Sequence, residues 1–431
     1  MFSRKYFAGA LSMLAVAALG LTSCAGGLNS SGGNAGSAGG AGIDPGATKE
    51  QYIAAFEDIE PITLDFQYSS TNPKSFSAQR DLKWAESVEE WSGGKVTIES
   101  HAAGAIAKPT EVPGALQDGR LDVAHYYTTY EPQEMAAFVD MSTSLVQLPS
   151  SPVVGEFVSH AVMMEVGFNT PEVMTNYEDR GMHVLHPANP NGNTSVICRE
   201  DQQAPADWAG SQIRGNAAAH EIQAKALGGV LTSVELAETY EALERGVLNC
   251  SLQSTATAVS VGWLEVAPFI SIPKDASFAP GAGALVAGSS WDGLPLLVQQ
   301  LMFDRMEGYV AGEDFNAIAS LKIATETAEK QGGKLDYLDS ESEAAIAESN
   351  KELLAQVENS KNLDGKAVNA AVASSIEKWT GIAKELGYVE KGGVTDFTQW
   401  YEGSVDPEDL EYFEPFAERV YEEIILPQRP Q

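Results

Sequence analysis

Cysteine is scarce in this chain, with three residues among 431. Cys24 follows an apolar N-terminal segment, whereas Cys198 and Cys250 are the only two cysteines in the remainder of the sequence. No CxxC pair or Cys/His cluster is present, so nothing in the pattern is typical of a structural zinc site. Disulfides persist in exported proteins. Because both later cysteines fall in predicted strands, the sequence leaves two states open, a Cys198–Cys250 bridge and two buried free thiols.

Basic residues are also few. The chain has 27 Lys and Arg residues and 60 Asp and Glu residues, which gives a formal net charge of −33. Such a charge repels the phosphates of nucleic acids, so we expect no nucleic-acid partner. It favours solubility and says little about the fold.

Long hydrophobic runs are absent after the N-terminus. Residues 6–21 are apolar and follow Arg4 and Lys5, which is typical of a secretory signal peptide, assigned here to residues 1–23. The next run, Leu-Thr-Ser before Cys24, resembles a lipobox, in which the cysteine is diacylated; the alternative is an ordinary signal peptide with an incidental cysteine. Two acyl chains anchor a protein stably. We therefore expect an extracytoplasmic protein that is lipid-anchored to the cell membrane.

Motifs of common enzyme classes are missing too. The chain has no GxSxG elbow, no HExxH, no Walker A loop and no GxGxxG after a predicted strand. Its six histidines are scattered, and nothing supplies a nucleophile with a matched base. The sequence therefore predicts a protein that is not an enzyme and needs no cofactor, with an exported hydrolase or lyase as the alternative.

The apolar periodicity predicts two βαβαβ units followed by one long helical region, residues 291–330. This order indicates an α/β fold of two lobes, a clamp like that of periplasmic binding proteins, with the helical region spanning both lobes and a ligand crevice between them. The predicted segments are the lipidated N-terminus and flexible linker 24–60, lobe I 61–190 completed by about 274–320, lobe II 191–273 completed by about 321–387, and a C-terminal extension 388–431.

One arginine stands out in the second unit. Arg214 ends the first predicted strand of residues 205–254, at the edge where an open α/β sheet keeps its ligand crevice. A guanidinium presents a planar fork that matches a carboxylate. The pattern alone leaves two possibilities, a clamp for a small organic acid and a surface ion pair.

The residues around Arg214 carry a family resemblance. DWAGSQIRG and then LGGVLTSVELAETYEALERGVLNC resemble the signature of solute-binding proteins of tripartite ATP-independent periplasmic (TRAP) transporters, and the similarity extends from about Ile62 to about Gly387. The resemblance implies that Arg214 pairs with the carboxylate of a small organic acid. It also implies delivery of that acid to integral-membrane permease subunits. The receptor of an ATP-driven importer and a sensory ectodomain are the alternatives.

Departures from the family pattern affect the predicted pocket. SLQS stands where the family has QENP, so Gln253 or Ser254 takes the place of the family's ligand-binding asparagine. A second arginine found in some members would fall near Asn193, which we assign as a polar ligand residue instead. The missing guanidinium favours a monocarboxylate, or a ligand recognised through amide and hydroxyl groups, over a strongly dianionic acid. A metal ion, present in some relatives, is not indicated here.

Four further side chains complete the predicted ligand-binding set. Tyr68 and Tyr126 end strands of the first lobe, Trp263 follows the last strand of the second unit, and Glu111 lies where many relatives place a polar group. For each of them, a place in the core or on the surface is the alternative.

Overall fold

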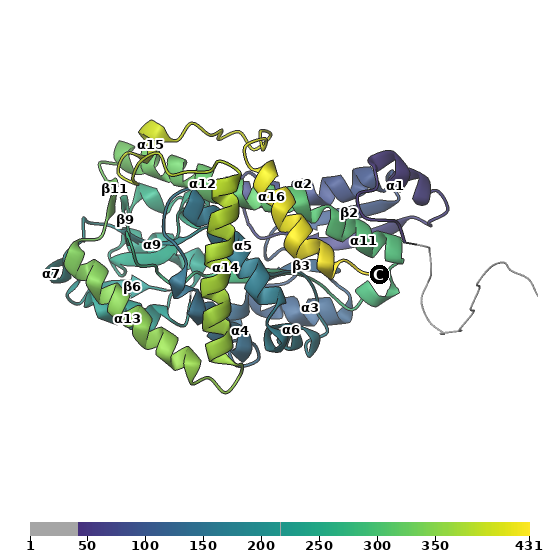
Figure 1. Cartoon of the computed structure of the whole chain (residues 1–431). Helices are drawn as coiled ribbons and strands as arrows, with labels where there is room; N and C mark the ends of the chain where they lie inside the picture. The colour runs from purple at the N-terminus through teal and green to yellow at the C-terminus, as the bar shows by residue number, and fades with distance from the viewer. Residues whose placement is uncertain (1–41, 216) are drawn as a thin grey trace, which may run out of the picture. The chain divides into compact units, whose positions relative to one another are not determined.

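The computed structural model describes residues 42–215 and 217–431, and in this part the chain forms two mixed β-sheets surrounded by helices (Figure 1). The first sheet has the order β2-β1-β3-β10-β4 and the second β11-β9-β5-β8-β6-β7. The strands of the first sheet are β1 (Ile62–Gln67), β2 (Val96–His101), β3 (Val123–Tyr126), β4 (His183–Pro190) and β10 (Ala282–Ala287). Those of the second are β5 (Thr194–Cys198), β6 (Gln212–Arg214), β7 (Val230–Leu231), β8 (Cys250–Ser254), β9 (Phe269–Ile272) and β11 (Lys334–Tyr337). The predicted α/β class is confirmed.

The first βαβαβ unit builds one side of the first sheet. Helix α2 (Phe76–Trp91) begins at Ser75, whose hydroxyl accepts the backbone N–H of Ala78 and so caps the helix. It packs on β2, and α3 (Val112–Asp118) connects β2 to β3. Strand β1 pairs in parallel with both β2 and β3, and helical crossovers connect these strands along the chain.

The second unit places Arg214 at the end of β6, the strand next to the edge strand β7 of the second sheet. Strand β6 pairs in parallel with β7 on one side and β8 on the other. Helix α8 (His220–Leu227) precedes β7 and ends at Gly228, whose φ of 100° favours glycine, and α9 (Thr239–Glu244) leads to β8. Cys198 of β5 lies directly opposite Cys250 of β8, and the two are joined in a disulfide.

The chain passes between the sheets more than once. It leaves the first sheet after β4 through residues 191–193, and returns after β9 through residues 273–281. The long helix α12 (Met306–Lys330) then contacts α2 beside the first sheet and β11 in the second. The helical region 291–330, predicted as one, is a short 3₁₀ helix at Trp291–Gly293 followed by α11 (Leu296–Asp304) and α12, which are separated at Arg305. The lobe boundaries stated above remain predictions, although the division of strands between sheets agrees with them.

The last helices pack on different parts of the fold. Helices α13 (Ser340–Glu358) and α14 (Gly365–Glu385) are followed by α15 (Phe397–Trp400) and α16 (Glu414–Val420), drawn in green to yellow in Figure 1. Helix α13 contacts α8 and α4 (Ala136–Ser144), α14 contacts α5 (Val154–Phe168), and the C-terminal helices α15 and α16 contact α12. Phe416 of α16 packs against Phe157 and Trp379 with ring centroids 4.8 and 5.5 Å apart. The predicted extension 388–431 is therefore an additional packed layer of the fold.

The described residues at the start of the chain pack against those at its end. Arg429 donates to Asp304 over 2.7 Å, and the hydroxyls of Tyr52 and Tyr421 donate to the same carboxylate. Helix α1 (Lys49–Ala55) buries Tyr52 completely. The assignment of residues 24–60 to a linker is thus too long, because residues 42–60 belong to the fold. Cys24 and the predicted signal peptide lie outside the described residues.

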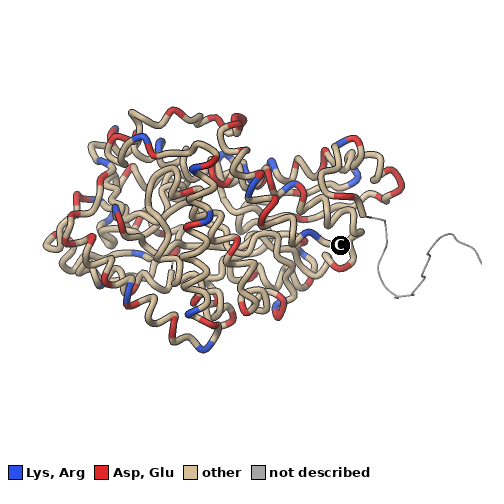
Figure 2. The backbone as a smooth tube through the Cα atoms, viewed as in Figure 1, with Lys and Arg blue, Asp and Glu red and all other residues tan. Residues whose placement is uncertain are grey.

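The excess of acidic residues and the lack of long hydrophobic runs, both noted in the sequence, are also seen in the structure. Figure 2 shows acidic residues along most of the described backbone, with basic residues interspersed. Within residues 42–215 and 217–431, no helix is both long and apolar enough to cross a bilayer.

Candidate functional site

Arg214 lies at the end of β6 and is almost fully buried, with 6 % of its surface exposed. Its Nε donates to the carbonyl oxygen of Val234 over 2.9 Å, and its guanidinium carbon lies 5.7 Å from the ring centroid of Trp263. Its Nη1 is buried and has no hydrogen-bond partner among the described residues. Burial lowers the pKa of Arg214, whereas Tyr130 and Glu235 raise it.

This guanidinium has no matched anion in the described part of the protein, where no carboxylate lies within ion-pair distance of Arg214. Burying a charged group without a close partner costs several kcal/mol of folding free energy. A buried guanidinium N–H without a partner can donate a hydrogen bond to the carboxylate of an external ligand, and the aromatic ring beside it can contact the rest of that ligand. Arg214 is therefore not part of an ordinary surface ion pair among the described residues.

Polar and aromatic groups of the same lobe surround this position. Trp263 is fully buried with its indole Nε1 unpartnered among the described residues, and the hydroxyl of Ser251, opposite Arg214 in the sheet, is likewise unpartnered. Gln253 accepts the backbone N–H of Ser254, and Ser254 caps α10 (Thr255–Ser260) by accepting from Thr257. The structure therefore brings Arg214 and Trp263 together, with the buried end of β8 beside them.

The first lobe contributes groups that sequence reasoning did not identify. Burial and the nearby Glu235 raise the pKa of Tyr130, and Arg214 opposes them, so these three side chains interact across the two halves of the fold. The hydroxyls of Ser70 and Ser260 also approach to 3.5 Å. Tyr130 lies in a short 3₁₀ turn after β3, and no sequence signal separates it from the neighbouring tyrosines. Tyr130, from the segment after β3, thus lies near Arg214 and Glu235 of the second unit.

Other predicted ligand residues lie in different surroundings. Tyr126 is fully buried and donates its hydroxyl to Glu131 over 2.8 Å, so that group is already satisfied. Glu111 is exposed and accepts the backbone N–H of Lys108. Tyr68 is 6 % exposed directly after β1, and no contact places it against Arg214.

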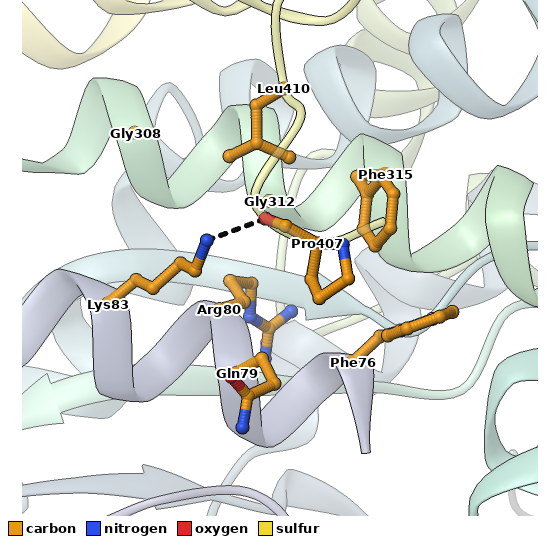
Figure 3. Close-up of a pocket in the computed structure, with 9 residues that line it drawn as sticks. All are labelled: Phe76, Gln79, Arg80, Lys83, Gly308, Gly312, Phe315, Pro407 and Leu410. Atoms are coloured by element: carbon orange, nitrogen blue, oxygen red, sulfur yellow. Dashed lines mark hydrogen bonds between the residues drawn. The ribbon is translucent and has the colours of Figure 1, made fainter. Parts of the chain in front are cut away.

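A small pocket occurs elsewhere in the fold, between α2, α12 and the C-terminal segment (Figure 3). Lys83 donates to the carbonyl oxygen of Pro407 at its rim, as the dashed line in the figure shows. None of its lining residues is a predicted ligand residue. Arg80 lines this pocket, and its buried Nη2 has no hydrogen-bond partner among the described residues. Its guanidinium is nevertheless paired with Asp81 through Nε over 2.9 Å, whereas Arg214 has no such carboxylate in the described part of the chain.

Comparison with known proteins assigns the family. Residues 68–361 match the model of bacterial extracellular solute-binding protein, family 7. The chain belongs to this family. The predicted resemblance is thereby confirmed, and the family consists of solute-binding proteins that act outside the cytoplasm, not of enzymes.

Solved structures share the fold of this family 7 solute-binding protein. A marine metagenome TRAP solute-binding protein specific for pyroglutamate is 19 % identical with a TM-score of 0.61, covering 73 % of this chain and 100 % of that one. A marine metagenome protein specific for aromatic acid ligands, with bound 3-hydroxybenzoate, is 17 % identical with a TM-score of 0.63, covering 74 % and 99 %. A sugar acid binding protein from Advenella mimigardefordensis, in complex with galactonate, is 17 % identical with a TM-score of 0.60, covering 75 % and 100 %.

A curated relative is known only as an uncharacterized protein, y4mM of Sinorhizobium fredii (strain NBRC 101917 / NGR234). It is 25 % identical over 256 residues, which is 57 % of this chain. The match spans 41 % of that relative's own length.

A buried ionic network lies at the first crossing between the sheets of this solute-binding protein. Asn193 donates its backbone N–H to both oxygens of Glu156 over 3.1 and 2.9 Å, and its side chain donates to the carbonyl of Pro149. Gly192 before it has a φ of 96°, which favours glycine. The predicted ligand role of Asn193 remains untested, and its hydrogen bonds tie the crossing to helix α5 (Val154–Phe168).

The network continues from Glu156 into α12. His160 lies 3.8 Å from Glu156 and 2.6 Å from Asp314, while His186 of β4 lies 3.1 Å from Glu313. Burial raises the pKa of Glu156 to about 7 and that of Asp314 to about 6. Burial lowers the pKa of His160, but the surrounding carboxylates outweigh it and raise the value to about 9.

These shifts predict that the free energy of unfolding falls as pH rises from 6.5 to 9. In this interval His160 and Glu156 hold protons in the folded state that the unfolded chain releases, so deprotonation removes stability. Burial lowers the pKa of His186 and of His220, so these two histidines make stability rise with pH. They do so only below the usual histidine pKa, outside this interval. We expect a loss of about 1–3 kcal/mol across the interval, measured by urea unfolding at several pH values.

The matched control for this prediction is His160→Gln, which removes the titrating ring and keeps a polar side chain. The variant should be less stable at pH 6.5 and should show a flatter profile up to pH 9. A wild-type profile without a decline, or an equal decline in both proteins, would contradict the assignment.

Proposed function

We propose that this protein is the extracytoplasmic, lipid-anchored receptor of a TRAP-type secondary transporter and captures a small organic acid whose carboxylate pairs with Arg214. It binds the acid in the crevice between the lobes, closes over it and delivers it to integral-membrane permease subunits. The observation that carries this proposal is the buried guanidinium of Arg214, whose Nη1 has no hydrogen-bond partner among the described residues.

The geometry suits a carboxylate. Each charge-assisted hydrogen bond contributes about 1.5–3 kcal/mol, and two of them with a few polar contacts reach micromolar affinity, about −8 kcal/mol. Nη1 is free to donate among the described groups, while Nε is held by Val234 and so keeps the guanidinium in position. Trp263 at 5.7 Å offers an apolar ring beside the charge.

The ligands of similar structures support an acid with one carboxylate. Pyroglutamate, 3-hydroxybenzoate and galactonate differ in ring, charge distribution and hydroxyl content, but each has a single carboxylate. The absence of an arginine at Asn193 agrees with a monocarboxylate in this protein as well. The rest of the ligand would then be selected by Trp263, Tyr130 and the end of β8.

A screen of organic acids tests the proposal. Wild-type protein should be stabilised in thermal-shift assays by at least one monocarboxylate, and calorimetry should confirm one binding site. The amide of the same acid is the matched control, because it keeps the shape and lacks the charge. Equal binding of acid and amide, or binding only of uncharged solutes, would contradict the proposal.

A further inference from the structure

Three metal-ligating side chains gather on the first sheet, at its edge. Asp65 lies on β1, and Glu99 and His101 lie on β2, which is the outermost strand. The strands are parallel, with Asp65 opposite Glu99 and Gln67 opposite His101. Because residues two apart on a strand share a face, this register directs all three side chains to one side of the sheet.

Their ligand atoms are close together. One nitrogen of His101 and one carboxylate oxygen from each of Asp65 and Glu99 lie within 4.8 Å of one another. His101 Nε2 and Asp65 Oδ1 are 2.8 Å apart, so two of the three groups already meet. All three residues retain solvent access, with 27 % of the His101 side chain and 41 % of the Asp65 side chain exposed.

The charges around this cluster are negative and not compensated by lysine or arginine. A third carboxylate, that of Asp122, accepts the backbone N–H of Asp65 over 2.7 Å. Among the described residues, Asp65, Glu99 and Asp122 form no ion pair with a lysine or arginine, and His101 is the partner of Asp65. A bound cation would offset the repulsion among these carboxylates.

We propose that Asp65, Glu99 and His101 bind one divalent transition-metal ion, with Zn²⁺ as the best match. One imidazole nitrogen and two carboxylate oxygens form a ligand set that suits Zn²⁺, whereas Ca²⁺ and Mg²⁺ prefer oxygen alone. Three protein ligands leave a position for water. The exposed Asp65 and Glu99 side chains can rotate to bring their oxygens to coordinating distance.

The ion would join the edge strand to its neighbour. Strand β2 pairs with β1 alone, so a ligand set shared by the two strands links them through side chains as well as through the backbone. Zn²⁺ binding to the folded state only would stabilise it by mass action. The site uses none of the residues assigned to the organic acid, so it stands whether or not that assignment holds.

Calorimetric titration of chelator-treated full-length protein with ZnCl₂ tests the site. We expect one equivalent to bind, to raise the melting temperature and to shift the ring signals of His101 among the six histidines in NMR spectra. His101→Gln and Asp65→Asn should each abolish this binding while keeping the metal-free melting temperature. The matched control is His183→Gln, since His183 lies 3.4 Å from Asp292 in an exposed pair that is not part of this trio. It should bind Zn²⁺ as wild type does.

Several results would overturn the proposal. These are no Zn²⁺ binding to wild type at micromolar concentration, unchanged binding in His101→Gln, or loss of binding in the His183→Gln control. Ca²⁺ binding of equal strength that does not depend on His101 would also overturn it, because the ion would then be held by carboxylates without the imidazole.

Discussion

Replacing Arg214 by alanine is expected to weaken binding of the organic acid by at least about 100-fold. The substitution removes two charge-assisted hydrogen bonds of about 1.5–3 kcal/mol each, and a tenfold change in affinity corresponds to about 1.4 kcal/mol. It also removes a buried charge that has no carboxylate partner among the described residues, so the ligand-free protein should fold and melt at or above the wild-type temperature. Calorimetry with the acid found in the screen measures the loss.

Two other variants make this result specific. Arg214→Lys keeps the charge but lacks the planar fork, and should lose part of the affinity. Arg245→Ala is the matched control in the same lobe, because Arg245 is exposed and pairs with Glu241 on the surface of α9. Its affinity should equal that of wild type. An Arg214→Ala protein that binds the acid normally would contradict the clamp.

Replacing Cys24 by alanine is expected to move the protein from the membrane to the soluble extracytoplasmic fraction. In the proposed function the Cys24 thiol is the attachment point, as the lipobox resemblance implies, and no helix in the described part of the chain is long and apolar enough to cross the bilayer in its place. Two acyl chains hold a protein at a membrane and their loss leaves only reversible contacts. Fractionation followed by immunodetection measures the change.

Ser23→Gly is the control for Cys24→Ala, because it keeps a small residue before the cysteine. It should remain in the membrane fraction, and mass spectrometry of its N-terminal peptide should show a diacylated cysteine. Membrane retention of the Cys24→Ala protein would contradict lipid anchoring.

The order of strands and helices could be predicted because it depends on local pattern. The apolar periodicity predicted two βαβαβ units, and the structure has them as the strands β1, β2 and β3 and the strands β6, β7 and β8 with helices between them. Arg214 could be singled out because its position at a strand end and the spacing of its neighbours are properties of one short segment. The end of the apparent linker was harder to place, since the burial of Tyr52 depends on Asp304 and Arg429, far away in the sequence.

The remaining site residues depend on tertiary structure. Tyr130 and Glu235 approach Arg214 from segments distant in sequence, and nothing in their local pattern distinguishes them. Tyr126 ends a strand as expected, but its hydroxyl is directed to Glu131 by the chain that follows it. The position of a residue at a strand end therefore indicates that it lies near the predicted crevice, but it does not determine whether its side chain points into that crevice.

The most direct test of the carboxylate clamp is a cycle of four calorimetric titrations, in which wild type and Arg214→Ala are each titrated with the acid and with its amide. The account predicts that wild type binds the acid far more tightly than the amide, and that this preference disappears in Arg214→Ala. An equal preference for the acid in both proteins would contradict it, because another group would then hold the carboxylate.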